Sequence, residues 1–181
     1  MINLQYVEDE LNFAKQELDV CIQTRQERHW RHFVEHLEVL LTNLMEITKG
    51  TSLEKDVKAA LELKKKDPLL KYVRESRNTI SHTAKRLTDK EPGKKIEGSD
   101  FKPIGAFIKA VDGTVIPMTN GFLFEVDFVL KTVKDKPGNI VVLPNYHLGQ
   151  PIKNPSSPAE VGKKALDFYT QLVQNIKVQN V

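Results

Sequence analysis

The stretch that decides the fold is WRHFVEHLEVLLTNLMEI, residues 30–47. Its apolar residues recur every three or four positions, a spacing that gathers side chains on one face of an α-helix. They are Trp30, Phe33, Val34, Leu37, Leu40, Leu41, Leu44 and Ile47. The stretch therefore predicts a long amphipathic helix, which ends near Gly50 because glycine readily takes the left-handed cap conformation.

Helices are predicted on both sides of this stretch. The preceding apolar residues, at the same spacing, are Leu4, Val7, Leu11, Ala14 and Leu18. After residue 50 the chain restarts with Ser52 as a helix cap and acids in the first turn. A further helix is predicted from about Leu69 to about Leu87, with Asp67 as its cap and Pro68 in its first turn.

The pattern changes to strands in the second half of the chain. The segment DKEPGKKIEGSD, residues 89–100, is interpreted as a charged linker. Two short apolar runs around Asp112-Gly113 predict a hairpin. Alternation over residues 121–130 predicts a half-buried strand, and PGN at 137–139 turns the chain into another strand. We expect an antiparallel meander of three or four strands, covered by a helix.

Helical signals return near the C-terminus. Ser157 is the expected N-cap, Pro158 the first helical residue, and Glu160 the third residue of a capping box. The expected apolar stripe is Val161, Ala165, Phe168, Leu172 and Ile176. We therefore predict a single α+β domain, 1–181. It is a mainly helical antiparallel bundle, about 3–90 and 157–178, with a small β-meander, about 101–145, inserted before the last helix.

Composition is ordinary for a folded globular protein, with 40% hydrophobic and 28% charged residues among 181. Cys21 is the only cysteine, which excludes an intrachain disulfide. The first ten residues carry acids where a secretory signal needs a basic end, and the apolar runs are too short for a membrane span. We therefore expect a soluble cytoplasmic protein.

Positive charge is concentrated in residues 49–95. This segment holds 14 basic and 7 acidic residues, whereas the whole chain has a net charge of +3. Such asymmetry suits an anionic partner such as nucleic acid. Within it, the three lysines at 64–66 are interpreted as solvated.

The basic segment contains RESRNTISH, residues 74–82. On a helical wheel, Asn78 and His82 lie nearly opposite the apolar stripe, and Arg77 lies at its edge. Lys71, Arg74 and Lys85 share the polar sector with them. A solvated helix face would carry the same residue types. A functional face would use arginine to bind phosphate and histidine to move a proton.

This stretch resembles the motif of the HEPN family, an arginine followed by a polar residue and, after four to six intervening positions, a histidine. Here these residues are Arg77, Asn78 and His82, and the resemblance covers about residues 1–90 and 157–178. Many HEPN proteins are metal-independent ribonucleases of toxin–antitoxin, phage-defence or RNA-processing systems. Others have no known cleavage activity. The inserted strands depart from the minimal pattern.

The resemblance implies an RNA-cleaving protein without a metal or other cofactor. His82 would be the general acid or base, Arg77 would stabilise the phosphate charge, and Asn78 would position either group. The expected RNA-binding residues are Lys71, Arg74, Lys85 and Arg86. A homodimer is expected, because one chain alone gives the motif little enclosure. An antitoxin or another protein is a further expected partner. The alternatives are a non-catalytic binding module and a purely structural protein.

Other polar residues give weaker signals. His29, His32 and His36 share a narrow sector of the second helix, but no acid or cysteine obviously completes a metal ligand set. An anion-binding groove and an ordinary polar flank remain as alternatives. His147 is interpreted as a loop residue, and Cys21 lacks a neighbouring base in the sequence, which argues against a nucleophile.

Overall fold

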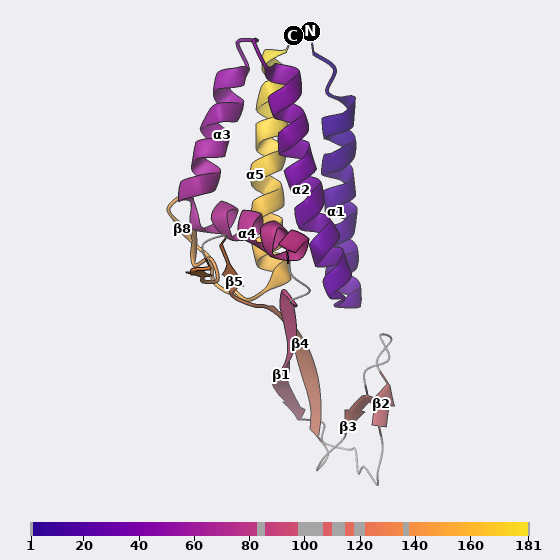
Figure 1. Ribbon diagram of the computed structural model, residues 1–181. Helices are drawn as coiled ribbons and strands as arrows, with labels where there is room; N and C mark the ends of the chain where they lie inside the picture. The colour runs from indigo at the N-terminus through magenta and orange to yellow at the C-terminus, as the bar shows by residue number, and fades with distance from the viewer. Residues whose placement is uncertain are drawn as a thin grey trace.

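The computed structural model describes most of the chain (Figure 1). The backbone is described for residues 2–82, 86–97, 107–109, 115–117, 122–135 and 138–180. Within these ranges, the side chains of residues 80–82, 90–97, 107–109, 115–117 and 122–127 are outside the description.

Helices make up most of the described structure. They are α1 (Gln5–Thr24), α2 (Glu27–Thr48), α3 (Glu54–Lys66), α4 (Pro68–His82) and α5 (Pro158–Gln179). Helices α1, α2, α3 and α5 run side by side, and α4 crosses one end of this group (Figure 1). The N- and C-terminal ends lie together, where the Ile2 N–H donates to the Asn180 side chain at 2.8 Å. The mainly helical α+β class predicted from the sequence agrees with this arrangement.

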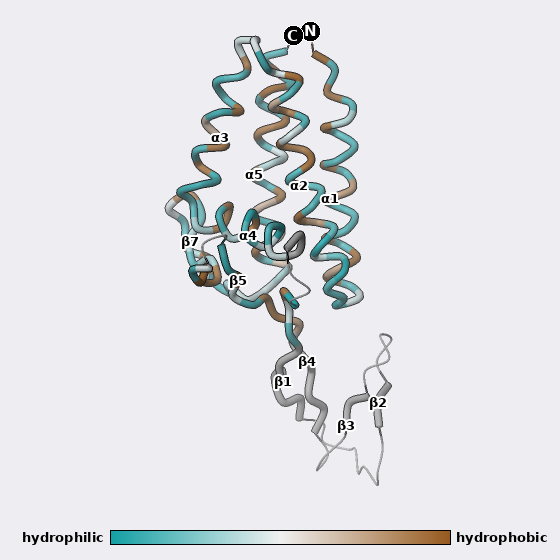
Figure 2. Tube along the Cα trace, viewed as in Figure 1, coloured by the Kyte–Doolittle hydropathy of each residue, from teal (hydrophilic) through white to brown (hydrophobic). Residues whose placement is uncertain are grey.

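The core follows the apolar stripe of α2. All the apolar residues of the predicted stripe from Trp30 to Leu44 are buried. The last one, Ile47, is partly buried. Figure 2 shows hydrophobic positions recurring along α1, α2, α3 and α5, and the buried residues of these helices belong to one core cluster. Burying each large aliphatic or aromatic side chain contributes about 1.5–3 kcal/mol, so this stripe is a major part of the core. Helix α5 approaches closely at Gly162, where an added Cβ would collide with Leu18 and press on Trp30.

Helix boundaries follow the predicted caps in part. The Leu70 N–H donates to Asp67 Oδ1 at 3.0 Å, which confirms Asp67 as the cap of α4. The predicted cap of α3 is wrong, because α3 begins at Glu54 and its N-cap residue Leu53 makes no side-chain cap bond. The predicted end of α4 near Leu87 is also wrong, since α4 ends at His82 and Leu87 lies outside helix.

Helix α5 begins as predicted but buries a shifted stripe. Ser157 accepts a hydrogen bond from the Glu160 N–H at 3.3 Å, and Pro158 is the first helical residue. The Glu160 carboxylate holds the preceding loop instead of the cap, since it accepts from the N–H groups of Lys153 and Asn154. The fully buried side chains are those of Val161, Ala165, Tyr169, Val173 and Ile176. The predicted Phe168 and Leu172 are only partly buried.

The strands form separate pairs rather than one meander. They are β1 (Thr88–Glu97), β2 (Phe107–Lys109), β3 (Val115–Pro117), β4 (Phe122–Leu130), β5 (Val133–Lys134), β6 (Ile140–Val141), β7 (Tyr146–His147) and β8 (Gln150–Pro151). Among the described residues the antiparallel partners are β1–β4, β2–β3, β5–β6 and β7–β8. The β2–β3 pairing agrees with the hairpin predicted around Asp112-Gly113, although that turn lies outside the described residues.

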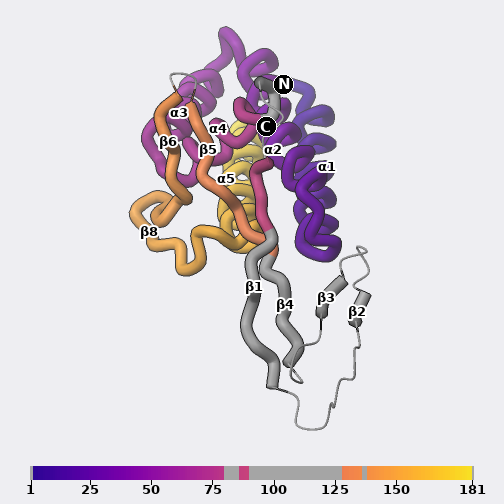
Figure 3. Tube along the Cα trace, turned by 60° about the horizontal axis from the view of Figure 1, so that its bottom comes forward, coloured from indigo at the N-terminus to yellow at the C-terminus, as the bar shows by residue number. Residues whose placement is uncertain are grey.

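The longest ladder, β1–β4, uses the segment interpreted as a linker. Thr88 pairs with Leu130 and Glu97 with Phe122, so the linker prediction is wrong. The charged residues and Pro92 of this segment are not typical of a strand. It becomes a strand by pairing with β4, some thirty residues further along the chain. The ladder leads away from the helices (Figures 1 and 3). Its base is anchored where the Leu87 N–H and the Thr88 hydroxyl both donate to the Glu27 carboxylate.

The short strands β5 and β7 pack against α4. The Tyr72 hydroxyl donates to the Lys131 carbonyl at 2.7 Å, and the Thr79 hydroxyl reaches the Lys134 carbonyl at 3.4 Å. Helix α4 therefore covers two of the short strands, rather than the face of one meander that the sequence predicted. None of the helices among the described residues has the length and apolar character needed to span a membrane.

Candidate functional site

Helix α4 carries the motif, and its buried face is wider than the helical wheel predicts. Leu69, Leu70, Tyr72, Val73, Glu75 and Ser76 are all buried. The apolar members of this set pack into the interior beneath the other helices, but Glu75 places a carboxylate there as well. The side chain of Glu75 is only 4% exposed. A buried carboxylate requires hydrogen-bond partners, and Glu75 finds them on α4 itself, in the motif residue Asn78 and in the neighbouring Arg74.

Two residues of the predicted site bind Glu75. The Arg74 Nε donates to Glu75 Oε1 at 2.7 Å, and the Asn78 Nδ2 donates to Oε2 at 3.0 Å. Asn78 is half-buried, whereas the wheel placed it nearly opposite the core. The difference arises because the core extends around α4 to Glu75, one turn before Asn78. The carboxylate therefore fixes the orientation of the Asn78 amide.

A lysine of α3 joins this group. Lys64 is buried and pairs with the Glu38 carboxylate of α2, so the interpretation of residues 64–66 as solvated is wrong for this one. Burial lowers the pKa of Lys64 below its usual value, and the pairing with Glu38 opposes that shift. The guanidinium groups of Arg74 and Arg77 lower this pKa further, since like charges disfavour the ammonium form.

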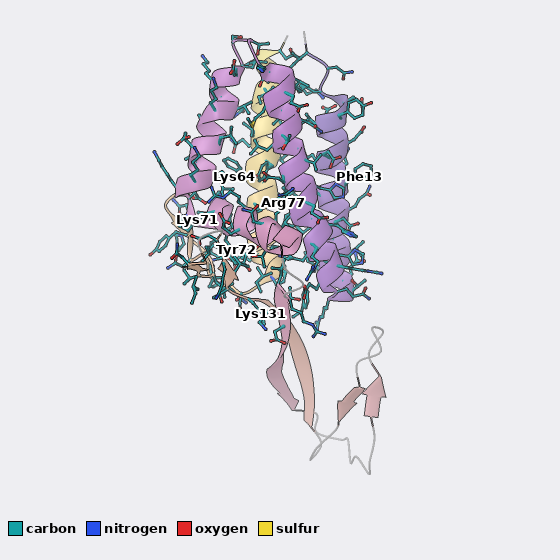
Figure 4. All side chains as sticks on the ribbon, in the orientation of Figure 1. Phe13, Lys64, Lys71, Tyr72, Arg77 and Lys131 are labelled. Atoms are coloured by element: carbon teal, nitrogen blue, oxygen red, sulfur yellow. The ribbon has the colours of Figure 1, made fainter. Side chains whose placement is uncertain are left out.

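We call Glu38, Lys64, Arg74, Glu75 and Arg77 the α4 charge cluster. Figure 4 shows Lys64 on α3 near the crossing of α4, and Arg77 on α4 itself. Arg77 is half-buried. A guanidinium in this position retains partial access to solvent and offers a planar set of N–H donors suited to a phosphate group.

The remaining predicted residues are placed in part. His82 is the last residue of α4, one helical turn beyond Asn78, but its side chain lies outside the described residues. Lys85 also lies outside them, Arg86 is exposed beyond the helix, and Lys71 is half-buried on α4. The structure therefore brings Arg74 and Asn78 together on the Glu75 carboxylate, and Arg77 lies on the same helix. It does not describe the position of the His82 imidazole relative to them.

Sequence reasoning missed the acids of the charge cluster. Glu75 stands next to Arg74 within the quoted stretch, residues 74–82, and an acid inside a basic stretch is a signal that could have drawn attention to it. Glu38 offers no such signal. It lies 26 residues before Lys64, and only the packing of α2 against α3 brings the two together.

The histidines outside the motif also acquire partners that the sequence did not show. His29 and His32 face Glu17 of α1, and His36 faces Glu10 of α1. The expectation that no acid accompanies these histidines is therefore wrong. We call Glu10, Glu17, His29, His32 and His36 the histidine seam.

Two further side chains are buried. His147 belongs to β7 and not to a loop, and its Nδ1 lies 3.0 Å from Asp67 Oδ1. Burial raises the pKa of the Cys21 thiol to about 12, with a smaller raising effect from Glu17. A thiol with so high a pKa stays protonated near neutral pH, which agrees with the sequence argument against a cysteine nucleophile.

Comparison with known proteins adds no assignment: no protein-family model, curated protein or solved structure matches this chain.

Proposed function

We propose that the protein is a metal-independent endoribonuclease of the HEPN type, acting through Arg77, Asn78 and His82. The observation that carries the proposal is that the motif belongs to one helix, α4, on which the buried Glu75 fixes the Asn78 amide. Catalytic groups work best when other side chains hold them in place before substrate arrives. Arg77 precedes this anchored amide on the same helix and is half-buried, so part of its guanidinium is in reach of solvent and of a phosphate group.

The chemistry requires only proton transfer and charge stabilisation. The ribose 2′-oxygen attacks the adjacent phosphorus, the bond to the 5′-oxygen breaks, and a 2′,3′-cyclic phosphate forms. One base accepts the 2′-hydroxyl proton, and one acid gives a proton to the leaving 5′-oxygen. His82 serves as one of these groups, and the Arg77 guanidinium stabilises the negative charge that grows on the phosphate.

The second proton-transfer group would come from a second copy of the chain. We propose a two-fold homodimer in which two α4 helices line one cleft. Repulsion between the basic residues of the two copies opposes a close contact. The Arg74–Glu75 pair lowers that cost, because the carboxylate neutralises one of the cations internally. A toxin or phage-defence effector with an antitoxin partner is the cellular role that the HEPN resemblance adds to this proposal.

The test is cleavage of a labelled RNA in excess chelator. We expect the wild-type protein to cleave and to leave cyclic-phosphate ends. His82→Ala should lower the rate by about 10²–10⁴-fold, the usual loss for a general acid or base. His36→Ala is the matched control, because it removes an imidazole from another part of the chain and should leave the rate unchanged. Equal rates for wild type and His82→Ala would contradict the proposal.

A second candidate is a binding module without cleavage activity. The observation in its favour is that Arg74 and Asn78 direct their donors inward to Glu75. RNA binding without cleavage would support this candidate. Phosphate contacts predict a steep loss of affinity between about 50 and 200 mM salt. Binding that is absent at low salt would exclude RNA as the partner of both candidates.

A further inference from the structure

Three side chains of types that bind metal ions lie close together between α1 and α2. The two helices are antiparallel neighbours joined by a short link, so the end of α1 faces the beginning of α2. Glu17 of α1 presents one carboxylate oxygen to each of two imidazoles of α2. Its Oε2 lies 2.6 Å from His29 Nδ1, and its Oε1 lies 3.6 Å from His32 Nδ1.

These ligand atoms are close enough to converge on one ion. One ligand atom from each of Glu17, His29 and His32 lies within 4.8 Å of the others. A tetrahedral zinc ion with bonds of about 2.1 Å holds its ligands roughly 3.4 Å apart. The 2.6 Å between Glu17 Oε2 and His29 Nδ1 must open by about 0.8 Å, and the widest separation must contract by up to about 1.4 Å. His32 can supply the contraction by side-chain rotation, because half of its side chain is exposed.

We propose that Glu17, His29 and His32 form a site for a divalent transition metal of the zinc type, which joins α1 to α2. A ligand set of two imidazoles and one carboxylate favours zinc, copper or nickel. Magnesium and calcium favour sites made of oxygen ligands alone. Water completes the coordination from the solvent side, where His32 is exposed. The site is separate from the ribonuclease motif on α4 and does not depend on it.

One cation near the site works against metal binding. The Arg28 Nε donates to His29 Nε2 at 3.1 Å, which places a positive charge beside the proposed ion. Arg28 is exposed and has room to turn toward water. Replacing it with a neutral residue removes the repulsion, so Arg28→Gln is expected to bind the metal several-fold more tightly.

The seam also provides a matched control. His36 Nδ1 lies 2.7 Å from Glu10 Oε2, so this pair joins the same two helices through the same residue types. The metal-ligand group found among the described residues does not include this pair, and its imidazole packs against the ring of Phe13. His36→Gln therefore alters the seam without removing a ligand.

The experiment titrates chelator-treated, dialysed protein with Zn²⁺ in a calorimeter and follows the visible absorption of bound Co²⁺. We expect one equivalent of metal per chain and a rise in melting temperature on Zn²⁺ addition. His32→Gln and His29→Gln should each weaken binding at least tenfold, because even loss of a supporting partner costs 10–100-fold. The metal affinity of His36→Gln should stay within about twofold of that of the wild-type protein. Circular dichroism checks that each variant is folded.

Three results would overturn the proposal. One is the absence of stoichiometric binding by the wild-type protein. Another is an equal loss of affinity in His36→Gln and His32→Gln, which would place the metal elsewhere in the seam. The third is weaker binding by Arg28→Gln, since a ligand set centred on His29 requires the opposite change. RNA cleavage is not the readout, so failure here leaves the ribonuclease proposal unaffected.

Discussion

The α4 charge cluster and the histidine seam contain similar groups in different surroundings. In the cluster, the side chains of Lys64 and Glu75 are 5% and 4% exposed, and each is paired inside the protein. In the seam, the side chains of His29 and His32 are 14% and 50% exposed. Buried charges are held to internal partners, because separating them without water is costly. The half-exposed imidazole of His32 can exchange its partner for water or a ligand at little cost, and that of His29 keeps more exposure than Lys64 or Glu75. The degree of burial therefore separates the two regions.

Breaking the charge cluster should give the largest effect. Glu38→Ala leaves the buried Lys64 ammonium without its partner and should lower the free energy of unfolding by about 3 kcal/mol. Lys64→Met removes the buried charge and leaves Glu38, whose side chain is 30% exposed, to bind water. This variant should stay within about 1 kcal/mol of wild type. Urea unfolding measures the free energy of unfolding of both variants. Equal losses in Glu38→Ala and Lys64→Met would show that the unpaired buried charge is not the cause of the destabilisation.

The Asp67–His147 pair combines features of both regions. It pairs a carboxylate with an imidazole as the seam does, but it is buried as the cluster is. Burial tends to raise the pKa of Asp67, but hydrogen bonds from the Leu148 N–H and the His147 ring outweigh it and lower this pKa below its usual value. At neutral pH, Asp67→Asn should lower the free energy of unfolding by about 2 kcal/mol.

The sign of the pH dependence follows from the lowered pKa of Asp67. Its carboxylate contributes stability above the unfolded pKa of about 3.9 and loses it as the pH falls through the lower folded value. The difference between wild type and Asp67→Asn should therefore be constant near neutral pH and shrink below about pH 4. Urea unfolding at several pH values measures this difference. A difference that grows on acidification would contradict the assignment.

The smallest effect is expected in the seam. In the Glu10–His36 pair, the side chains keep 21% and 30% of their exposure. Glu10→Gln should change the free energy of unfolding by less than about 1 kcal/mol, because water replaces the lost contact. Thermal unfolding in chelator measures this, and a loss as large as that of Glu38→Ala would remove the distinction between the two regions.

The sequence by itself predicted the helices and the caps of α4 and α5, but not the cap of α3. The apolar repeat of residues 30–47 predicted α2, and the alternation of residues 121–130 predicted β4. Asp67 and Ser157 were identified as caps because capping depends on residues within one turn of the helix end. The same local logic located Arg77 and Asn78 on one helix. Periodicity and capping act between near neighbours in the chain, and these are the relations that a sequence displays directly.

Only the tertiary structure decided which polar side chains became partners. The strand β1 has a charged, proline-containing sequence, and pairing with the distant β4 makes it a strand. Lys64 is buried while its two neighbours are exposed, because α3 turns that position toward Glu38 of α2. Glu17 meets His29 and His32 only through the register of α1 against α2. Register depends on the packing of whole helices, and single-sequence periodicity fixes which face is buried but not which residue lies opposite.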